Sequence, residues 1–230
     1  MTAPLAIVSG ASRGIGAAIA LRLYREGWQL SLGMRTPSMP PWADPERCHL
    51  YPYDASVGRE ADWVADALAR FGRVDAVVAS AGIMLPGNVI DAPEEDLDRM
   101  LDINVKAPRR LVRAAFPALK ASGRGRVVIL ASLSGKRVKS ANAGMYSVSK
   151  FGAVALAHGI RQAGYEHGVR ATAVCPSFVD TDMARAITDR RSDAMTDPDE
   201  LAAIVSMLIS LSNTASVAEF HVNCQLEEVY

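Results

Sequence analysis

Tyr146 and Lys150 stand four residues apart, the spacing that places two side chains on one face of a helix, one turn apart. A free tyrosine, whose pKa is about 10, is a poor acid–base group near neutral pH. A fixed lysine cation beside the phenol favours the phenolate and lowers its pKa. A pKa lowered by roughly 3 would poise the phenol for proton transfer near neutrality. The pair predicts acid–base chemistry, but an ordinary amphipathic helix can also carry Tyr-x-x-x-Lys by chance.

Three glycines near the N-terminus form a turn suited to a phosphate group. Gly10, Gly14 and Gly16 lie between an apolar run and a helix-length segment. Such glycines let the backbone approach a pyrophosphate, which the unpaired N–H groups of the helix then meet. The spacing is G-x-x-x-G-x-G rather than the G-x-G-x-x-G fingerprint, and glycines also occur in plain turns. The place between a buried run and a helix favours a nucleotide-binding loop.

Small or polar residues occupy further places that match a nucleotide site. Ala81 and Gly82 come at the end of the fourth apolar run, where an open α/β sheet places its ligand crevice. Ser132 ends the fifth run and is either a turn former or a hydroxyl at that crevice. Asn104 stands within a long helical segment, although asparagine is only a modest helix former. It has either a local role or a solvated side chain.

These residues sit among short apolar runs that alternate with helix-length segments. Most of the runs are continuously apolar, as in strands covered on both faces; they are 5–9, 29–34, 48–53, 74–80, 126–131, 169–175 and 219–223. The helical segments are 15–26, 59–71, 94–120, 143–167 and 198–211. This rhythm predicts a Rossmann-type, doubly wound parallel β-sheet in a three-layer α/β/α arrangement.

Segment 36–45 breaks the rhythm, because its four prolines are hard to place in a helix and predict an irregular loop. The sequence has no internal repeat, low-complexity tract or linker. Residues 1–230 are therefore expected to form a single domain.

Composition argues against several classes of protein. Lys and Arg together number 25, as do Asp and Glu, so no net charge favours nucleic acid or an anionic membrane. No apolar stretch reaches the about 18 residues of a membrane span, and no basic leader opens the chain. Cys48, Cys175 and Cys224 lie far apart, which fits reduced thiols in a cytoplasm. The four histidines lack metal-ligand spacing, and we expect no metal.

In combination the motifs resemble the short-chain dehydrogenase/reductase family of NAD(P)-dependent oxidoreductases, nearly from end to end. The order of glycine turn, Asn, Ser and Tyr-x-x-x-Lys is highly specific, although each part alone is not. The resemblance implies that Tyr146 is the acid in carbonyl reduction and the base in alcohol oxidation. Lys150 would lower the pKa of Tyr146 and hold the nicotinamide ribose. Ser132 would orient the reacting group, and Asn104 would fix a water that links Lys150 to solvent.

A competing serine, Ser134, lies two residues beyond Ser132. We prefer Ser132 because Gly135 then follows it by three residues, as in similar family members. The predicted reaction is hydride transfer between a nicotinamide cofactor and a small secondary alcohol or carbonyl.

The resemblance further implies that NADP(H) is preferred over NAD(H). Met34 stands where NAD enzymes of this fold usually have an acid, and it would not repel a 2′-phosphate. Arg13 and Arg35 could flank that phosphate with bidentate hydrogen bonds, unless both are solvated surface residues. Asp54 would meet the adenine edge. The expected cofactor contacts are Gly10, Ser12, Arg13, Gly14, Ile15, Gly16, Arg35, Asp54, Ala55, Ala81, Gly82, Asn104, Tyr146, Lys150, Pro176, Val179 and Thr181.

Four features depart from the family pattern. Ser9 replaces the usual Thr but keeps its hydroxyl, and Ser80 replaces an Asn in a way that could alter a hydrogen bond bracing the sheet. Ser177 replaces a Gly and could reshape the floor of the nicotinamide pocket. The segment 219–230 lacks the usual glycine pair.

A homotetramer is expected from the long helices 94–120 and 143–167, with a homodimer as the fallback if the altered C-terminus breaks one contact.

Other interpretations stay open. An NADP-binding sensor or scaffold could use the same fold without chemistry, and an epimerase or dehydratase acting on nucleotide-sugars is a third class. Segment 181–197 would be a mobile lid over a small substrate. A basic loop beyond Ser132 either meets an anionic substrate or is simply solvated; its cations are Lys136, Arg137 and Lys139. Five apolar side chains are expected around the entrance to the substrate site, although any one of them could instead pack in the hydrophobic core. They are Met84, Met145, Phe178, Met183 and Met195.

Overall fold

Parallel strands form a single seven-stranded sheet in the computed structural model of the chain, which describes residues 3–226. The order across the sheet is β3-β2-β1-β4-β5-β6-β7. The strands are β1 Leu5–Ser9, β2 Gln29–Met34, β3 Cys48–Pro52, β4 Ala76–Ala79, β5 Arg126–Leu130, β6 Arg170–Pro176 and β7 Glu219–Val222. The chain runs outward from β1 to β3 and then returns to the centre at β4. Such a reversal of strand order places a ligand crevice at the carboxyl ends of the strands.

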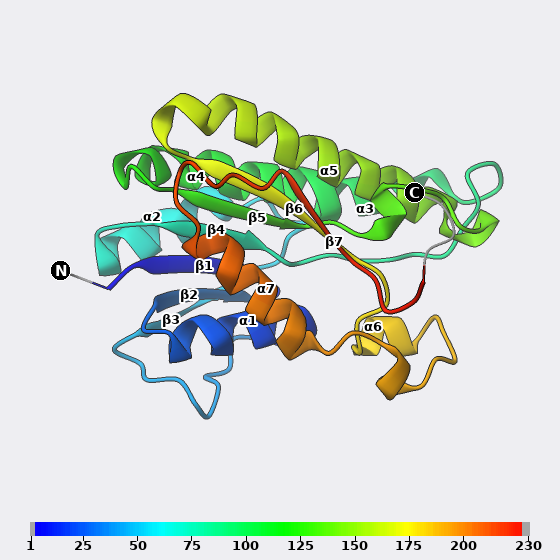
Figure 1. Cartoon of the computed structure of the whole chain (residues 1–230), viewed down its shortest axis with the longest axis horizontal. Helices are drawn as coiled ribbons and strands as arrows, with labels where there is room; N and C mark the ends of the chain where they lie inside the picture. The colour runs from blue at the N-terminus through cyan, green and yellow to red at the C-terminus, as the bar shows by residue number, and fades with distance from the viewer. Residues whose placement is uncertain (1–2, 227–230) are drawn as a thin grey trace.

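Helices cover both faces of the sheet, as the alternating sequence pattern predicted (Figure 1). Helices α2, α4 and α5 lie on one face, and α1 and α7 lie on the other. The helices are α1 Gly14–Arg25, α2 Glu60–Phe71, α3 Glu94–Leu101, α4 Ala107–Ala121, α5 Gly144–Gly164, α6 Asp182–Arg185 and α7 Pro198–Ser210. The Rossmann-type fold class is confirmed, and the proline-rich segment before β3 is irregular as expected.

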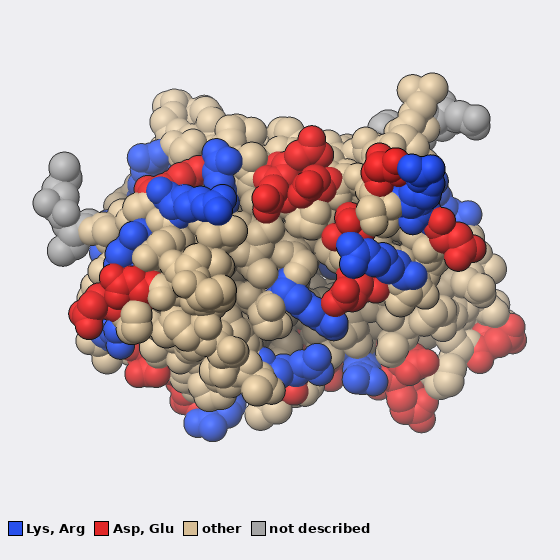
Figure 2. All heavy atoms as spheres, turned by 90° about the horizontal axis from the view of Figure 1, so that it is seen from below, with Lys and Arg blue, Asp and Glu red and all other residues tan. Residues whose placement is uncertain are grey.

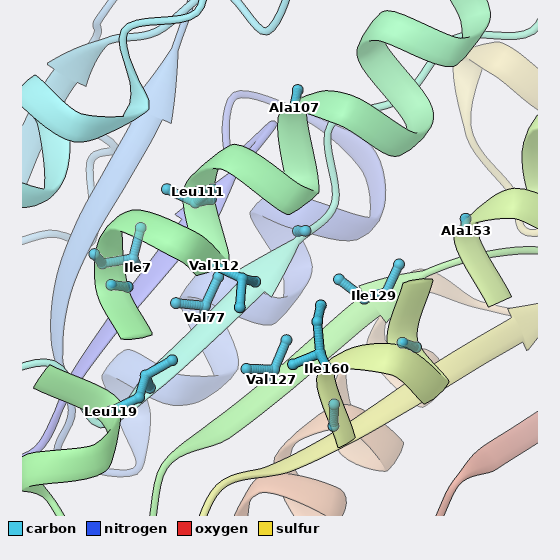
Figure 3. Packing of buried hydrophobic residues seen from close by; sticks show 14 of the residues in the cluster. Ile7, Val77, Ala107, Leu111, Val112, Leu119, Val127, Ile129, Ala153 and Ile160 are labelled. Carbon is cyan, nitrogen blue, oxygen red and sulfur yellow. The ribbon is translucent and has the colours of Figure 1, made fainter. Parts of the chain in front are cut away.

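A hydrophobic core lies on each side of the sheet because the strands are buried on both faces. Figure 3 shows one side, where Ile7, Val77 and Val127 of the sheet pack toward Leu111 of α4 and Ile160 of α5. On the other side, buried residues of the same strands pack against α1 and α7. The two cores hold the strand ends, and therefore the residues that follow them, in fixed positions.

The long helix predicted for residues 94–120 is not one regular helix. A π-helical turn, Asp102–Lys106, separates α3 from α4. π-Turns inside helices are rare and occur frequently at functional sites. This one contains Asn104, whose side chain it turns into the protein interior.

Acidic and basic side chains are interspersed on the face that carries α1, α6 and α7 (Figure 2). The described part of this face therefore lacks the continuous basic surface that nucleic-acid binding uses. None of the helices in residues 3–226 combines the length and the apolar character that crossing a membrane requires.

A buried ion pair joins α2 to α4. The carboxylate of Glu60, whose side chain is 1% exposed, accepts hydrogen bonds from Arg110 Nε at 2.9 Å and Nη2 at 3.0 Å. The hydroxyl of Tyr53 donates to the same carboxylate at 3.1 Å. Three donors thus converge on one desolvated acid.

Glu60→Gln should lower the free energy of unfolding by about 2 to 4 kcal/mol, because it leaves the half-buried Arg110 without its charged partner. Chemical denaturation of both proteins measures the difference. Arg59→Gln, which removes an exposed ion pair with Asp62 on the same helix, is the control and should change stability little. Equal stability of Glu60→Gln and the unaltered protein would contradict this account of the contact.

Candidate active site

Helix α5 carries Tyr146 and Lys150 on the face that it turns toward the sheet. Both side chains are buried, with exposed fractions of 9% and 6%. The Nζ atom of Lys150 lies 5.6 Å from the centroid of the Tyr146 ring and donates a hydrogen bond of 2.7 Å to the carbonyl of Leu130, the last residue of β5. The helical spacing predicted from the sequence therefore produces a close, buried pair at a strand end.

Ser132 meets this pair from the other side. It follows β5 in an extended conformation, and its Oγ caps a short 3-10 helix, Leu133–Gly135, by accepting from the N–H of Ser134 at 3.1 Å. Its hydroxyl donates to the carbonyl of Pro176 at 3.4 Å and is also in hydrogen-bond contact with Tyr146. The contact with Tyr146 supports Ser132 over Ser134, although both line the cavity described below.

Gly135 allows this 3-10 helix to lie directly against α5. A Cβ atom at position 135 would come within 2.5 Å of the carbonyl oxygen of Lys150, closer than real Cβ contacts allow. The glycine three residues beyond Ser132 thus has a packing role that keeps the serine next to the tyrosine.

Burial dominates the electrostatics of the pair. It raises the pKa of Tyr146 to about 12, while the hydrogen bond with Ser132 lowers it. Burial also lowers the pKa of Lys150 to about 8. The sequence predicted a lowered pKa for Tyr146, and that direction is wrong in this structure. The reason is that desolvation penalises the phenolate, a cost that spacing along a helix does not reveal.

Three hydrogen bonds hold the side chain of Asn104 in place. Its Oδ1 accepts from the N–H of Ile83 at 2.9 Å, and its Nδ2 donates to the carbonyl of Ile83 and to Ser149 Oγ, both at 2.9 Å. A Cβ atom at Gly82 would lie 3.2 Å from Asn104 Oδ1 and 3.7 Å from Lys150 Nζ. Asn104 therefore lies beside Lys150 and clamps the loop that follows β4.

A cavity of about 590 Å³ opens beside these residues at the carboxyl ends of the strands. Several residues expected to catalyse or to bind the cofactor line it: Ile15, Gly82, Ser132, Tyr146, Lys150, Pro176, Val179 and Thr181. The other expected residues do not line it: Gly10, Ser12, Arg13, Gly14, Gly16, Arg35, Asp54, Ala55, Ala81 and Asn104. The cavity thus contains the reactive end of the predicted site.

The glycine turn is packed too tightly for side chains. A Cβ atom at Gly16 would lie 2.3 Å from the carbonyl oxygen of Gly10, and one at Gly10 would lie 2.9 Å from the backbone of Ala81. Gly10 and Gly14 also have positive φ angles of 68° and 55°, which favour glycine. A cradle of bare backbone at a helix start fits a phosphate group, so the residues present fit a dinucleotide.

The two arginines considered for a 2′-phosphate are both exposed. Arg13 precedes α1 and forms an ion pair of 2.9 Å with Asp182 of α6. Arg35 directly follows β2, where Met34 is buried in the core. The position considered for an acid is therefore filled by a packed apolar side chain.

The residues expected near the adenine lie beyond β3. The Asp54 carboxylate accepts from the N–H and hydroxyl of Ser56, which lowers its pKa, and Arg35 contributes a smaller lowering. Ala55 is buried, and its carbonyl accepts from Arg110 at 2.8 Å. Neither lines the cavity.

Two of the departures from the family pattern have a structural role. The hydroxyl of Ser9 accepts from the N–H groups of Ser80 and Ala81, each at 3.1 Å, and so braces β1 against the loop after β4. The hydroxyl of Ser177 donates to Cys224 Sγ at 3.3 Å and accepts from the Cys224 N–H at 3.0 Å. The floor of the pocket is thereby tied to the segment after β7.

The segment after β7 supplies a lining residue that the sequence did not single out. Gln225 lines the cavity and accepts a hydrogen bond from Arg190, whose guanidinium also lies 5.4 Å from the ring centroid of Phe178. The only sign of this role in the sequence was that segment 219–230 departs from the family pattern. Residues 227–230 of that segment lie outside the described part of the chain.

The expected substrate mouth divides into two groups. Met84, Phe178 and Met183 line the cavity. Met145 and Met195 are buried and do not line it, so for these two the core interpretation applies. The predicted lid contributes through α6 and its flanks.

A group of potential metal ligands lies on β6 and β7. Cys175, Glu219 and His221 have ligand atoms within 4.8 Å of one another. The Glu219 carboxylate is already paired with Lys136 Nζ at 2.9 Å and with His158 Nε2 at 2.9 Å. A lysine cation at this carboxylate opposes a metal ion, and we assign none.

Comparison with known proteins places this geometry among oxidoreductases. Residues 4–192 match the family model described as short chain dehydrogenase. Agropine synthesis reductase of Rhizobium rhizogenes is 35% identical over 99% of this chain and 54% of its own length. The chain thus spans about half the length of that relative. Oxidoreductase UcpA of Salmonella typhimurium is 31% identical over 95% of this chain and 85% of its own.

A solved structure extends the likeness to the whole fold. An alcohol dehydrogenase from the archaeon Thermococcus sibiricus, complexed with 5-hydroxy-NADP, superposes with a TM-score of 0.85 at 27% identity. The match covers 98% of this chain and 99% of that one.

Proposed function

Because the chain belongs to the short-chain dehydrogenase family, we propose that it is an NADP(H)-dependent oxidoreductase that interconverts a small secondary alcohol and its carbonyl. The observation that carries the proposal is the buried group of Tyr146, Ser132 and Lys150 that lines the cavity. Asn104 stands beside it within a π-helical turn. A sensor or scaffold would not need an acid–base group with a cation and a second hydroxyl around it.

Each of the four side chains has a separate role in one proton transfer. Tyr146, protonated near neutral pH because its pKa is raised to about 12, gives its proton to the carbonyl oxygen during reduction. Ser132 holds that oxygen in line with the phenol. Lys150 offers a cation near the developing phenolate, which the cation stabilises. After the transfer, Lys150 passes a proton to the phenolate and regains one from solvent through a water that Asn104 positions.

When bound, the nicotinamide supplies the hydride. Gly10, Gly14 and Gly16 would hold the pyrophosphate, with Ser12 and Ile15 in the same turn. On the nicotinamide side, the residues that would hold the ring and its ribose are Ala81, Gly82, Lys150, Pro176, Val179 and Thr181. Asp54 and Ala55 would border the adenine.

The preference for NADP(H) rests on charge at the adenosine end. Arg13, directly before α1, and Arg35, directly after β2, are both exposed, and Met34 is not a carboxylate. Arg13 would exchange Asp182 for the 2′-phosphate, a doubly charged and bidentate partner.

The pKa of Lys150 sets the expected pH dependence of reduction. Because burial lowers that pKa to about 8, the ammonium is present below this pH and lost above it. The kcat/KM for carbonyl reduction should therefore be level below about pH 8 and fall above it, by up to about tenfold per pH unit. A Lys150→Arg variant keeps its charge and should lose this fall. A profile that rises from pH 7 to pH 9 would contradict the role of the cation.

We also propose assembly as a homotetramer, with a homodimer as the alternative, and a cytoplasmic location. The described cysteines are all free thiols, which suits a reducing compartment. Helix α5 exposes Val148 and Phe151, apolar side chains that a symmetric contact would bury. Light scattering that gives the mass of a monomer at working concentrations would refute both assemblies.

The function is tested by screening reduced nicotinamide consumption against aldehydes, ketones, keto acids and sugars with NADPH and NADH. Turnover of at least one carbonyl with NADPH is expected. Binding of NADPH without turnover of any member of a broad panel would favour the sensor instead.

A further inference from the structure

Arg110 of α4 is bonded both to the turn that follows β3 and to the start of α2. Its Nη2 atom donates to the carbonyl oxygen of Ala55 at 2.8 Å and to Glu60 Oε1 at 3.0 Å. Its Nε atom donates to Glu60 Oε2 at 2.9 Å. Ala55 lies in the turn, and Glu60 is the first residue of α2. One guanidinium therefore holds both segments from a helix that comes much later in the chain.

The turn spans residues 54–58 and has contacts of its own. Asp54 Oδ1 accepts from the N–H of Ser56 at 2.9 Å and from its hydroxyl at 2.7 Å. Contacts between such close neighbours shape a turn but do not attach it to the rest of the protein. The side chain of Ala55 packs in the core, and the bond from Arg110 attaches the backbone of the turn to α4.

The Glu60 carboxylate orients the guanidinium. It is buried, and it also accepts from the hydroxyl of Tyr53 at 3.1 Å. The hydrogen bonds with this carboxylate raise the pKa of Arg110, so the cation keeps its charge. A planar guanidinium that is bonded twice to a buried carboxylate has little freedom to rotate. The donor that reaches Ala55 is therefore fixed in direction.

The turn lies at the edge of the sheet that carries the proposed nucleotide site. Strands β2 and β3 are parallel, and the N–H of Tyr53 donates to the carbonyl of Met34, the last residue of β2, at 2.8 Å. Arg35 and Asp54 thus follow neighbouring strand ends. The pKa of Asp54 is lowered by the hydrogen bonds from Ser56 and, to a smaller extent, by the charge of Arg35. The glycine turn follows β1, the other neighbour of β2, at the same edge.

We propose that Arg110 is a positioning residue for the adenine end of the nucleotide, because its bond to Ala55 holds the turn in the conformation that presents Asp54 and Ala55. The inference rests on the proposed function, which places these two residues at the adenine. A turn that is already ordered loses little conformational entropy when the nucleotide binds. Without the bond, the ligand would have to order the turn, and its affinity would fall. Arg110 acts in this way without touching the nucleotide.

Two ligands that lack nicotinamide measure this effect apart from hydride transfer. Calorimetry gives the Kd of ADP-ribose and of 2′-phospho-ADP-ribose for the unaltered protein and for Arg110→Met. Both Kd values should rise by about tenfold, the cost of ordering one or two residues. The two factors should be equal, because both ligands carry the adenine. Arg13→Ala combined with Arg35→Ala should instead weaken 2′-phospho-ADP-ribose alone.

Further variants separate positioning from stability. Glu60→Gln should destabilise the protein but leaves an amide oxygen for Arg110, so the bond to Ala55 persists and both Kd values should change less than about threefold. Glu60→Gln combined with Arg110→Met leaves no buried charge unpaired, and it should weaken binding as much as Arg110→Met does. Arg109→Gln removes an exposed cation from the same helix and should change neither Kd.

Hydrogen exchange adds a local measurement. In free Arg110→Met, the amides of residues 55–58 should exchange faster than in the unaltered protein and should regain protection when 2′-phospho-ADP-ribose binds. A loss of stability throughout the molecule would not be confined to this turn.

Each outcome separates the inference from the proposed function. Unchanged Kd values in a folded Arg110→Met protein would overturn the inference, and so would an equal loss of affinity in Glu60→Gln. Failure of the unaltered protein to bind either ligand would remove both the inference and the proposed cofactor. Binding that depends on Arg110, without turnover of any carbonyl, would support the inference while the proposed function fails.

Discussion

Tyr146→Phe should lower kcat by about 10²- to 10⁴-fold while the fold and cofactor affinity are kept, the loss typical of a removed general acid. The variant deletes only the hydroxyl, and the buried ring keeps its packing beside Met100 and Met145. The proton would then have to come from water. Single-turnover reduction, with cofactor affinity measured separately by fluorescence, distinguishes lost chemistry from lost binding.

Tyr165→Phe is the matched control. Tyr165 follows the same helix, is exposed, and stacks its ring beneath Arg170 at 4.0 Å. Its hydroxyl has no part in the proposed chemistry, so kcat should be unaffected. Lys150→Ala should lose turnover and also weaken cofactor binding, because its two proposed roles are coupled. Full activity of Tyr146→Phe would remove the tyrosine from the mechanism.

Arg13→Ala combined with Arg35→Ala should raise the KM for NADPH by about 100-fold and change NADH use little. Two charge-assisted contacts with a 2′-phosphate would give a preference of that order. NADH has a hydroxyl at that position and gains little from either guanidinium. Steady-state kinetics with both cofactors and one accepted substrate measure the change.

Two further variants sharpen the cofactor test. Arg25→Ala removes an exposed cation at the end of α1, away from the glycine turn, and should leave both KM values unchanged. Asp182→Asn frees Arg13 from its ion pair and should lower the KM for NADPH slightly. Equal or better kcat/KM with NADH in the unaltered enzyme would contradict the preference.

The sheet could be predicted from the sequence because its strands are buried on both faces. Run 5–9 is apolar up to its final serine, and run 29–34 has leucine or methionine at every second position. The observed β1 and β2 have the same limits as these runs. The order of Asn104, Ser132, Tyr146 and Lys150 also predicted which residues meet, since the fold places strand ends and one helix face together.

Other features depend on contacts that local patterns do not contain. The π-helical turn at Asn104 interrupts a helix whose apolar periodicity continues through it. The raised pKa of Tyr146 comes from burial, which depends on the packed protein. Gln225 lines the cavity because Ser177 binds Cys224, a contact between residues 47 positions apart.

The central claim is that this chain transfers hydride with Tyr146 as the proton donor. Its most direct measurement uses NADPH carrying deuterium at the transferred position, with mass spectrometry of the alcohol product. The account predicts one deuterium on the carbinol carbon, formed rapidly by the unaltered enzyme and far more slowly by Tyr146→Phe. Product without deuterium, or the same rate of labelling in both proteins, would contradict it.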